Sequence, residues 1–265
     1  GKNHEGSYLT DTIMLASLKP SENKAALVSI PRDLAVPMEN MGWRKVNNIN
    51  AFAETKESGS GGLAASQAIS DVLNIPIDYY LRVDFEGFVN IINELGGIKV
   101  YVENTLNDYA YPVLGEEESY PYESRFEHLY VEKGWQEMDG ELALKYARSR
   151  HAAGIEGSDF ARGRRQQKIL EAAKDKIISM RVLFKPRLIT NIIDNLRDHV
   201  STNLKIWEMA KLWNMVQDIK KENIATKVLD DSPGGLLAGS IVEDGAYILT
   251  PKSGDFTEVQ YLIAN

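Results

Sequence analysis

The stretch FEGFVNIINELGGIKVYV, residues 85–102, changes its periodicity halfway and decides the fold class. Apolar side chains recur at helical spacing as far as Leu95, which predicts a helix with one buried face. Gly96-Gly97 then stands where a left-handed helix C-cap needs glycine, and Ile98–Val102 is typical of a strand. A helix followed directly by a strand indicates an α/β protein.

The same alternation is present upstream. We expect strands over Thr12–Leu18 and Ala25–Ile30, a helix over Gly61–Leu73 and a strand over Ile77–Val83. This order predicts an α/β fold with three α-β-α layers and a central mixed β-sheet. Ligands of such sheets lie at the carboxyl ends of strands.

Downstream, the polar and acidic residues 104–133 predict a long surface insertion. Further helices are expected over Asp139–Arg148, Asp159–Met180, Arg187–Asp198 and Asn203–Lys221. We expect one domain over residues 1–225, with residues 226–265 as an extension of turns and short strands packed on it. Trp135 and the other tryptophans after it fit helix or core packing.

Composition excludes several classes of function. The 265 residues contain no cysteine, which excludes disulfides, thiolate nucleophiles and cysteine metal sites. The net charge of −8 argues against nucleic-acid binding. No apolar run is long enough to span a bilayer, and because the chain starts at Gly1 without a methionine we expect a signal or anchor ahead of it.

The local distribution of charge points to an anionic ligand. Between Glu103 and Glu141 the chain has 11 acidic residues against two basic ones, and a basic cluster follows. The cluster comprises Arg148, Arg150, Arg162, Arg164, Arg165 and Lys168. An acidic protein with such a cluster is suited to hold phosphate, and its first two arginines end one helix close to the next. The alternative is a solvated basic helix face paired with the acidic segment.

The helix that opens at Asp159 separates these arginines by direction. At 100° per residue, Asp159 and Gln166 lie within about 60° of Arg162, whereas Arg164 points to the opposite side. The N-terminus of a helix favours anions, and a guanidinium fork fits phosphate oxygens. We therefore select Arg162 as a phosphate ligand and discount Arg164.

Asp11 precedes the first predicted strand and Arg32 follows the second. Neighbouring strands would bring both residues to sheet edges where ligands bind, whereas we expect a hairpin to place them at opposite ends. The spacing alone leaves both arrangements open. By itself, Asp11 is more typical of a turn or a helix cap than of a metal ligand.

Several short motifs in order resemble the LytR-CpsA-Psr (LCP) family between Asp11 and about Leu170. They are LTDTIML at 9–15, SIPRD at 29–33, KVN at 45–47, PIDYY at 76–80, ELGGI at 94–98, MDGELAL at 138–144, YARSR at 146–150, SDFAR at 158–162 and RQQ at 165–167. The resemblance implies a sheet between helices, an apolar groove for a polyprenyl chain and a rim of arginines around its pyrophosphate. Residues 1–225 would then form the catalytic domain.

The resemblance also implies a role for each matched residue. Asp11 would be the carboxylate that holds Mg²⁺, and Asp159 would orient an arginine or act as a base. The pyrophosphate clamp would consist of Arg32, Arg148, Arg150 and Arg162, supported by Lys45 and Gln166. The chain departs from the family pattern at Leu9 and Val36, where arginines are common. The usual upstream acid is also absent, so either Glu5 or His4 takes its place or the metal site is built differently.

The activity implied by the resemblance is transfer of a glycopolymer from a polyprenyl-pyrophosphate carrier onto peptidoglycan. Such a phosphotransferase works at the extracytoplasmic face of a bacterial membrane and is anchored there at its N-terminus. Two alternatives remain open: hydrolysis of the same lipid, and a non-catalytic module that binds polyprenyl lipids for regulation. All of them require the chosen arginines to surround one pocket that opens into an apolar tunnel.

Overall fold

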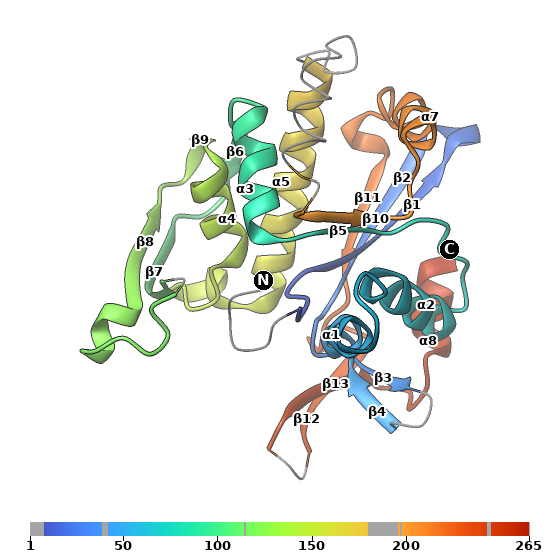
Figure 1. Ribbon diagram of the computed structural model, residues 1–265, viewed down its shortest axis with the longest axis horizontal. Helices are drawn as coiled ribbons and strands as arrows, with labels where there is room; N and C mark the ends of the chain where they lie inside the picture. Colours follow the sequence, from blue (N-terminus) through green and yellow to red (C-terminus); the bar gives the residue numbers. More distant parts are fainter. Residues whose placement is uncertain are drawn as a thin grey trace. The chain divides into compact units, whose positions relative to one another are not determined.

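The computed structural model describes residues 8–38, 42–113, 115–179, 196, 198–242 and 245–264, without the side chains of Asp159 and Ile206 (Figure 1). The chain divides into two units. The first unit comprises Gly1–Arg82 and Ser201–Asn265, and the second unit comprises Val83–Val200. The predicted helix over 187–198 lies outside the described residues except for Leu196 and Asp198.

A mixed three-stranded sheet organises the first unit. The strands β1 (Ile13–Lys19) and β2 (Lys24–Ile30) form the expected hairpin, with Ile13 opposite Ile30. Strand β11 (Ile224–Val228) pairs with β2 in parallel, although nearly the whole sequence separates them. The predicted domain boundary after residue 225 therefore falls inside a strand of this sheet. That division of the chain stays a prediction.

A second hairpin leads from the sheet into two helices. It consists of β3 (Ala35–Met38) and β4 (Gly42–Lys45), and it is followed by α1 (Val46–Lys56) and α2 (Gly61–Leu73). Helix α2 has the predicted bounds, while α1 was not predicted. Its polar residues Asn47 and Asn50 are buried, so no clean apolar stripe marks it in the sequence.

The C-terminal part of the chain belongs to the same core. After β5 (Leu81–Val83), which pairs with β10 (Val200–Thr202), the first unit continues with α7 (Ile206–Val216), β12 (Leu237–Ile241), β13 (Tyr247–Pro251) and α8 (Thr257–Ala264). Leu229, Leu237 and Val259 pack in one cluster with Val28 and Ile30. The predicted strands and turns are present, but helix α8 was missed.

The deciding stretch of the sequence folds as expected in the second unit. Helix α3 (Phe85–Glu94) is capped by Asp84, whose side chain accepts from the backbone N–H of Gly87. Gly96 and Gly97 have φ of 70° and 79°, the left-handed conformation that ends the helix, and β6 (Ile98–Val102) follows. Helices α4 (Gly140–Arg148) and α5 (Asp159–Ser179) also agree with prediction.

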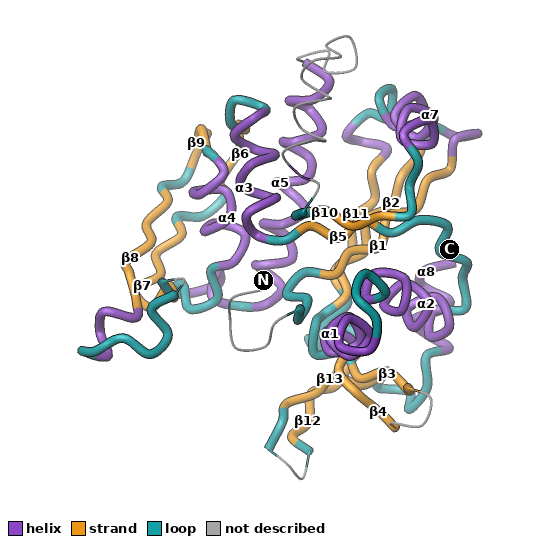
Figure 2. Tube along the Cα trace, in the orientation of Figure 1, coloured by secondary structure: helices purple, strands orange, loops and turns teal. Residues whose placement is uncertain are grey.

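The predicted surface insertion over residues 104–133 is wrong. This segment contains β7 (Leu106–Pro112) and β8 (Phe126–Val131), which pair antiparallel, while β9 (Gly134–Met138) pairs with β6. Figure 2 shows β7 and β8 running side by side, and Leu106, Tyr111, Leu129 and Val131 are buried in one core cluster with residues of α3, α4 and α5. Alternate residues point to solvent, and these polar and tyrosine positions hid the buried ones.

The mixed α/β class is confirmed. Among the described residues, the strands form one sheet of three strands and five sheets of two. Within the same residues, no helix combines the length and the apolar character that crossing a bilayer requires.

Candidate functional site

The hairpin register decides where Asp11 and Arg32 lie. Because β1 and β2 run antiparallel with Ile13 opposite Ile30, the residues just before β1 and just after β2 share one end of the sheet. The expectation that a hairpin separates them is therefore wrong. Arg32 Nη1 lies 2.5 Å from Asp11 Oδ1 and donates a hydrogen bond to it.

Two further charges extend this pair. Lys45 Nζ donates to Asp33 Oδ1 at 2.7 Å, and Arg32 Nε lies 3.6 Å from Asp33 Oδ2. The two carboxylates and the two cations therefore alternate, and we call Asp11, Arg32, Asp33 and Lys45 the first charged group. Asn47 donates its backbone N–H to the Arg32 carbonyl, which fixes the start of α1 beside the group.

Buried polar atoms without a hydrogen bond gather at the same place. Within the described part of the chain, three buried side-chain polar atoms lack a hydrogen bond: Thr10 Oγ1, Arg32 Nε and Asn47 Oδ1. Thr10 and Asn47 are also joined through their backbones, so all three atoms belong to one neighbourhood. Buried polar groups are almost always paired, and an unpaired cluster is a signal for a ligand.

The second unit holds the other predicted residues. Arg148 ends α4, its Cζ lies 4.2 Å from the centre of the Phe85 ring, and its Nη1 is 3.4 Å from Tyr111 Oη. Gln166 Nε2 donates to the Ala147 carbonyl at 3.3 Å, which attaches α5 to the last turn of α4. Arg162 is buried, with 7% of its surface exposed, and Arg164 is exposed, as the helical geometry predicted.

A loop between α4 and α5 carries Arg150, and two buried charges hold it. Asp108 is fully buried and accepts from Ser149 Oγ at 2.6 Å and from the backbone N–H of His151 at 3.2 Å. On the other side, Arg165 donates to the carbonyl oxygens of Tyr146, Ser149 and Glu156. Both residues flanking Arg150 are thereby fixed to the core.

Arg165 also forms a buried ion pair, which the sequence analysis missed. Its Nη1 lies 2.8 Å from Glu156 Oε2, and Glu156 accepts a second hydrogen bond from Asn104. Burial lowers the pKa of Arg165, and the Glu156 carboxylate opposes that shift. Its guanidinium stands 5.8 Å from the ring of Tyr146, whose pKa burial raises to about 12.

The structure therefore brings the predicted residues together in two groups. One joins Asp11, Arg32 and Lys45 in the first unit, and the other joins Arg148, Gln166 and the Arg150 loop in the second. The convergence of both groups on one ligand stays a prediction. The side chain of Asp159 lies outside the described residues, and Ser158 Oγ caps α5 by accepting from Ala161 N.

The residues suit Mg²⁺ only as a partner of phosphate. Among the described residues, no cluster of three His, Asp or Glu side chains could hold a metal by itself. Asp11 and Asp33 each already face a cation. Mg²⁺ is commonly held by one or two carboxylates together with substrate phosphates and water, so Asp11 fits such a site once a phosphate is present.

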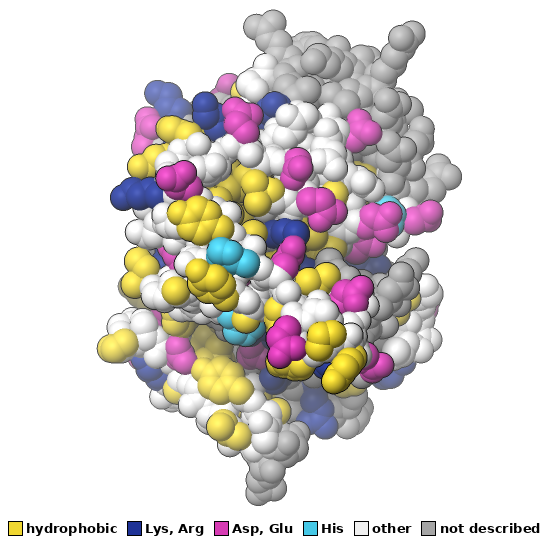
Figure 3. Space-filling model, turned by 90° about the vertical axis from the view of Figure 1, so that its left-hand side faces the viewer, with side chains coloured by type: hydrophobic (Ala, Val, Ile, Leu, Met, Phe, Trp, Pro, Cys, Tyr) yellow, Lys and Arg dark blue, Asp and Glu magenta, His cyan; other side chains and the backbone are white. Residues whose placement is uncertain are grey.

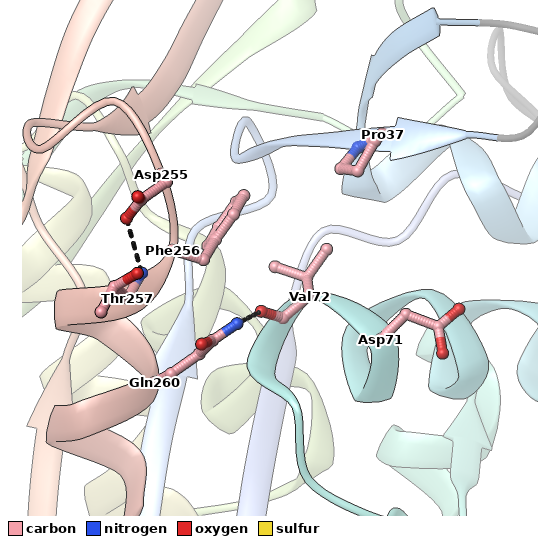
Figure 4. Close-up of a pocket in the computed structure, with 7 residues that line it drawn as sticks. All are labelled: Pro37, Asp71, Val72, Asp255, Phe256, Thr257 and Gln260. Atoms are coloured by element: carbon pink, nitrogen blue, oxygen red, sulfur yellow. Dashed lines mark hydrogen bonds between the residues drawn. The ribbon is translucent and has the colours of Figure 1, made fainter.

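A pocket of about 300 Å³ lies elsewhere in the first unit (Figure 4). Its wall consists of Pro37, Asp71, Val72, Asp255, Phe256, Thr257 and Gln260. Gln260 Nε2 donates to the Val72 carbonyl at 2.8 Å and so ties α8 to α2 beside it. None of the predicted site residues lines this pocket, so the apolar tunnel behind the arginines stays a prediction.

A family model described as the LytR_cpsA_psr family matches residues 1–264. The chain belongs to this family. It is 32% identical over 217 residues to the polyisoprenyl-teichoic acid–peptidoglycan teichoic acid transferase TagV of Bacillus subtilis. The matched residues cover 82% of this chain and 50% of TagV. TagT of the same organism is 28% identical over 231 residues, or 86% of this chain and 63% of TagT.

Solved LytR_cpsA_psr structures share the fold. The crystal structure of B. subtilis TagV superposes with a TM-score of 0.69 at 26% identity and covers 99% of this chain and 91% of that one. A structure of TagT bound to LI-WTA gives a TM-score of 0.67 at 22% identity, with coverage of 97% and 84%. The chain spans about half the length of the curated relatives it matches first.

Proposed function

We propose that the chain is the catalytic part of a transferase that moves a glycopolymer from a polyprenyl-pyrophosphate carrier onto peptidoglycan outside the cytoplasm. Family membership and the names of TagV and TagT as teichoic acid transferases support this proposal. The observation that carries it is the first charged group, where Arg32 pairs with Asp11 and where Thr10 Oγ1, Arg32 Nε and Asn47 Oδ1 are buried without a hydrogen bond. A phosphate-rich ligand would supply acceptors for Arg32 Nε and bind both cations.

The cations around Arg32 in the first unit and around Arg148 in the second suit the negative charge that develops in such a transfer. When a sugar hydroxyl attacks the phosphorus next to the glycopolymer, negative charge grows on the departing polyprenyl phosphate. Guanidinium groups held in place stabilise that charge without reorganising. Arg32 is oriented by Asp11, and Arg148 by Phe85 and Tyr111. Mg²⁺ held through Asp11 would neutralise part of the same charge.

The test uses a labelled lipid-linked glycopolymer, Mg²⁺ and peptidoglycan. The parent protein should move label into the wall material, and Arg32→Ala should lower kcat by at least about a hundredfold, the typical effect of removing one donor to a developing anion. Arg44→Ala is the matched control, since Arg44 is exposed and bonds only to the Trp43 carbonyl among the described contacts.

Other outcomes would contradict the proposal. Label released to water instead of wall material would show a hydrolase. Lipid binding without turnover, at any Mg²⁺ concentration, would show a binding module. Equal activity of Arg32→Ala and Arg44→Ala would remove the first charged group from the site.

A further inference from the structure

The strands of the second unit form a ribbon with two different faces. Strand β6 is followed by β7 after three linking residues, and β8 is followed by β9 after two. Because β6 pairs with β9 and β7 pairs with β8, the four strands form one two-stranded ribbon. Lys133 N donates to Thr105 Oγ1 and joins the two links. One face of this ribbon packs into the core, and we call the opposite one the outer face.

Aromatic side chains line the outer face at two places. Tyr101 of β6 and Trp135 of β9 stand directly opposite each other, with ring centres 5.3 Å apart in an edge-to-face arrangement. Trp135 keeps 64% of its surface exposed, so the expectation that it packs in the core is wrong. Lys99 lies 5.7 Å from the Trp135 ring centre and helps to hold it.

The second place is a group of three rings on β7 and β8, of which two are stacked. His128 lies parallel to Tyr109 with centres 4.1 Å apart, and the Tyr130 ring is 6.2 Å from His128 on the same strand. Asn107 hydrogen-bonds His128 Nε2 at 2.6 Å and fixes the middle ring. Tyr109 and Tyr130 remain exposed by 69% and 56%. The rings therefore contact one another and still face solvent.

The charges around the rings restrict the partner. Figure 3 looks onto this side of the structure and shows hydrophobic and histidine side chains between acidic ones. Exposed carboxylates in the ribbon are Glu103, Glu132 and Glu137, against Lys99 and Lys133, and Glu103 pairs with Lys168 at 2.7 Å. The region from Glu103 to Glu141 carries 11 acidic residues and two basic ones. Acidic and basic side chains nearly balance around the rings, so no basic patch is present to attract a polyphosphate or an anionic membrane, and the carboxylates accept hydrogen bonds but donate none.

We infer that the outer face binds an uncharged glycan strand of β-linked N-acetylhexosamines. The C–H bonds on the faces of such sugars carry partial positive charge and pack on the negative faces of aromatic rings. Their hydroxyl and acetamido N–H groups supply the donors that the surrounding carboxylates lack. Trp and Tyr combine an apolar ring with a polar edge, which suits a ligand that stays half solvated.

The two aromatic places also set the length of the ligand. Four residues, 131–134, separate Tyr130 from Trp135, so five extended steps of the chain set an upper limit of about 17 Å on the distance between the two places. A single sugar ring offers one ring face for stacking, whereas an oligosaccharide offers several and can occupy both places. Binding should therefore strengthen with glycan length. The inference rests on the proposed function in one respect: the glycan bound here would be the acceptor in the transfer reaction.

The experiment titrates the whole protein with β-1,4-linked N-acetylglucosamine dimers and hexamers, followed by calorimetry. The hexamer should bind, and the dimer should bind more weakly. Trp135→Thr/Tyr130→Thr should weaken hexamer binding about tenfold or more, in line with the loss of aromatic stacking platforms. Thr is chosen because it favours strands. The control Trp207→Thr/Tyr261→Thr removes equally exposed rings from α7 and α8 and should bind like the parent.

A single-ring variant controls for misfolding. Tyr109→Thr changes one ring of the stack and should give an intermediate loss, with an unchanged thermal midpoint. Equal hexamer binding by parent and ring variants would overturn the inference. The inference would also be overturned if the parent protein formed a homodimer at high protein concentration and the ring variants did not, because a second copy of the chain would then cover the outer face. Binding of poly(glycerol phosphate) in place of the hexamer would overturn it as well.

Failure of this inference can be told apart from failure of the proposed function. Arg32→Ala should lose transfer and keep hexamer binding, whereas the ring variants should raise KM for the glycan acceptor and leave kcat nearly unchanged. If the parent transfers label but its ring variants keep the same KM, the outer face is not the acceptor site. If the parent shows no transfer yet binds the hexamer through the rings, only the proposed function is wrong.

Discussion

Arg165 shows how one buried cation can support residues that carry function. It is 2% exposed, and its donors all reach the segment between Tyr146 and Glu156, in which Arg148 and Arg150 lie. Replacing it with Met would leave Glu156 as a buried carboxylate with no cation. We expect Arg165→Met to lower the free energy of unfolding by about 3–5 kcal/mol, measured by urea denaturation.

The neighbouring Arg164 provides the control for this prediction. It is exposed on the same helix, so Arg164→Met should change the free energy of unfolding by no more than about 0.5 kcal/mol. Arg165→Lys retains the charge and loses the planar fork, so its free energy of unfolding should lie between those of the two Met variants. Equal stability of the Met variants at both positions would show that the ion pair with Glu156 contributes nothing net.

His199 adds a dependence on pH at the start of α3. Its Nδ1 lies 2.9 Å from Asp84 Oδ2, and Glu86 and Asp198 add negative charge nearby. The hydrogen bond to Asp84 raises the pKa of His199 above 6.5. A raised pKa in the folded state means that the stabilisation is complete below about pH 6.5 and is lost as the pH rises through the folded value.

We therefore predict that His199→Gln lowers the thermal midpoint at pH 5.5 and changes it little at pH 8.5. Thermal melts of both proteins across this range measure the difference, and pH values below 5 are avoided because carboxylates titrate there. Asp84→Asn keeps a capping side chain for α3 and should remove the same pH dependence. A midpoint difference that grows toward alkaline pH would contradict the assignment.

At the scale of elements, the contact between α3 and α4 depends on Gly140. A Cβ at this position would overlap the carbonyl oxygen of Val89, and Gly140 N donates to Asn93 Oδ1 at 2.8 Å. We expect Gly140→Ala to force the helices apart and to cost about 1–3 kcal/mol in unfolding free energy. Gly234→Ala meets no atom within 4 Å and should be tolerated, so comparable losses for both would refute the steric argument.

Elements with local signals were predictable, and those that depend on distant partners were not. The end of α3 at Gly96-Gly97 and the strand β6 follow from adjacent residues, and both have the expected place. Strand β7 was missed because its inward positions include Asp108, a carboxylate that is buried only because Ser149 and His151 bind it. Likewise, the Asp11–Arg32 pair required the register of β1 against β2, which residue spacing does not contain.

At the scale of the whole molecule, the two units divide the predicted site residues between them. Arg32 belongs to the first unit and Arg148 to the second, and the chain passes between the units twice, after Arg82 and after Val200. The sequence resemblance predicts that both arginines bind one pyrophosphate. If this is true, the loss of either should already remove most of the shared transition-state stabilisation, because groups that act as a unit are not additive.

A double-mutant cycle measures this coupling directly. We expect Arg32→Ala/Arg148→Ala to lose clearly less kcat/KM than the product of the single losses, with a coupling free energy above about 0.5 kcal/mol. The matched cycle of Arg32→Ala with Arg164→Ala should be additive, since Arg164 is exposed on the discounted face of α5. Additivity in both cycles, with each single variant impaired, would mean that the two units act on different parts of the reaction. The residues around Arg32 and those around Arg148 would then each need a ligand of their own.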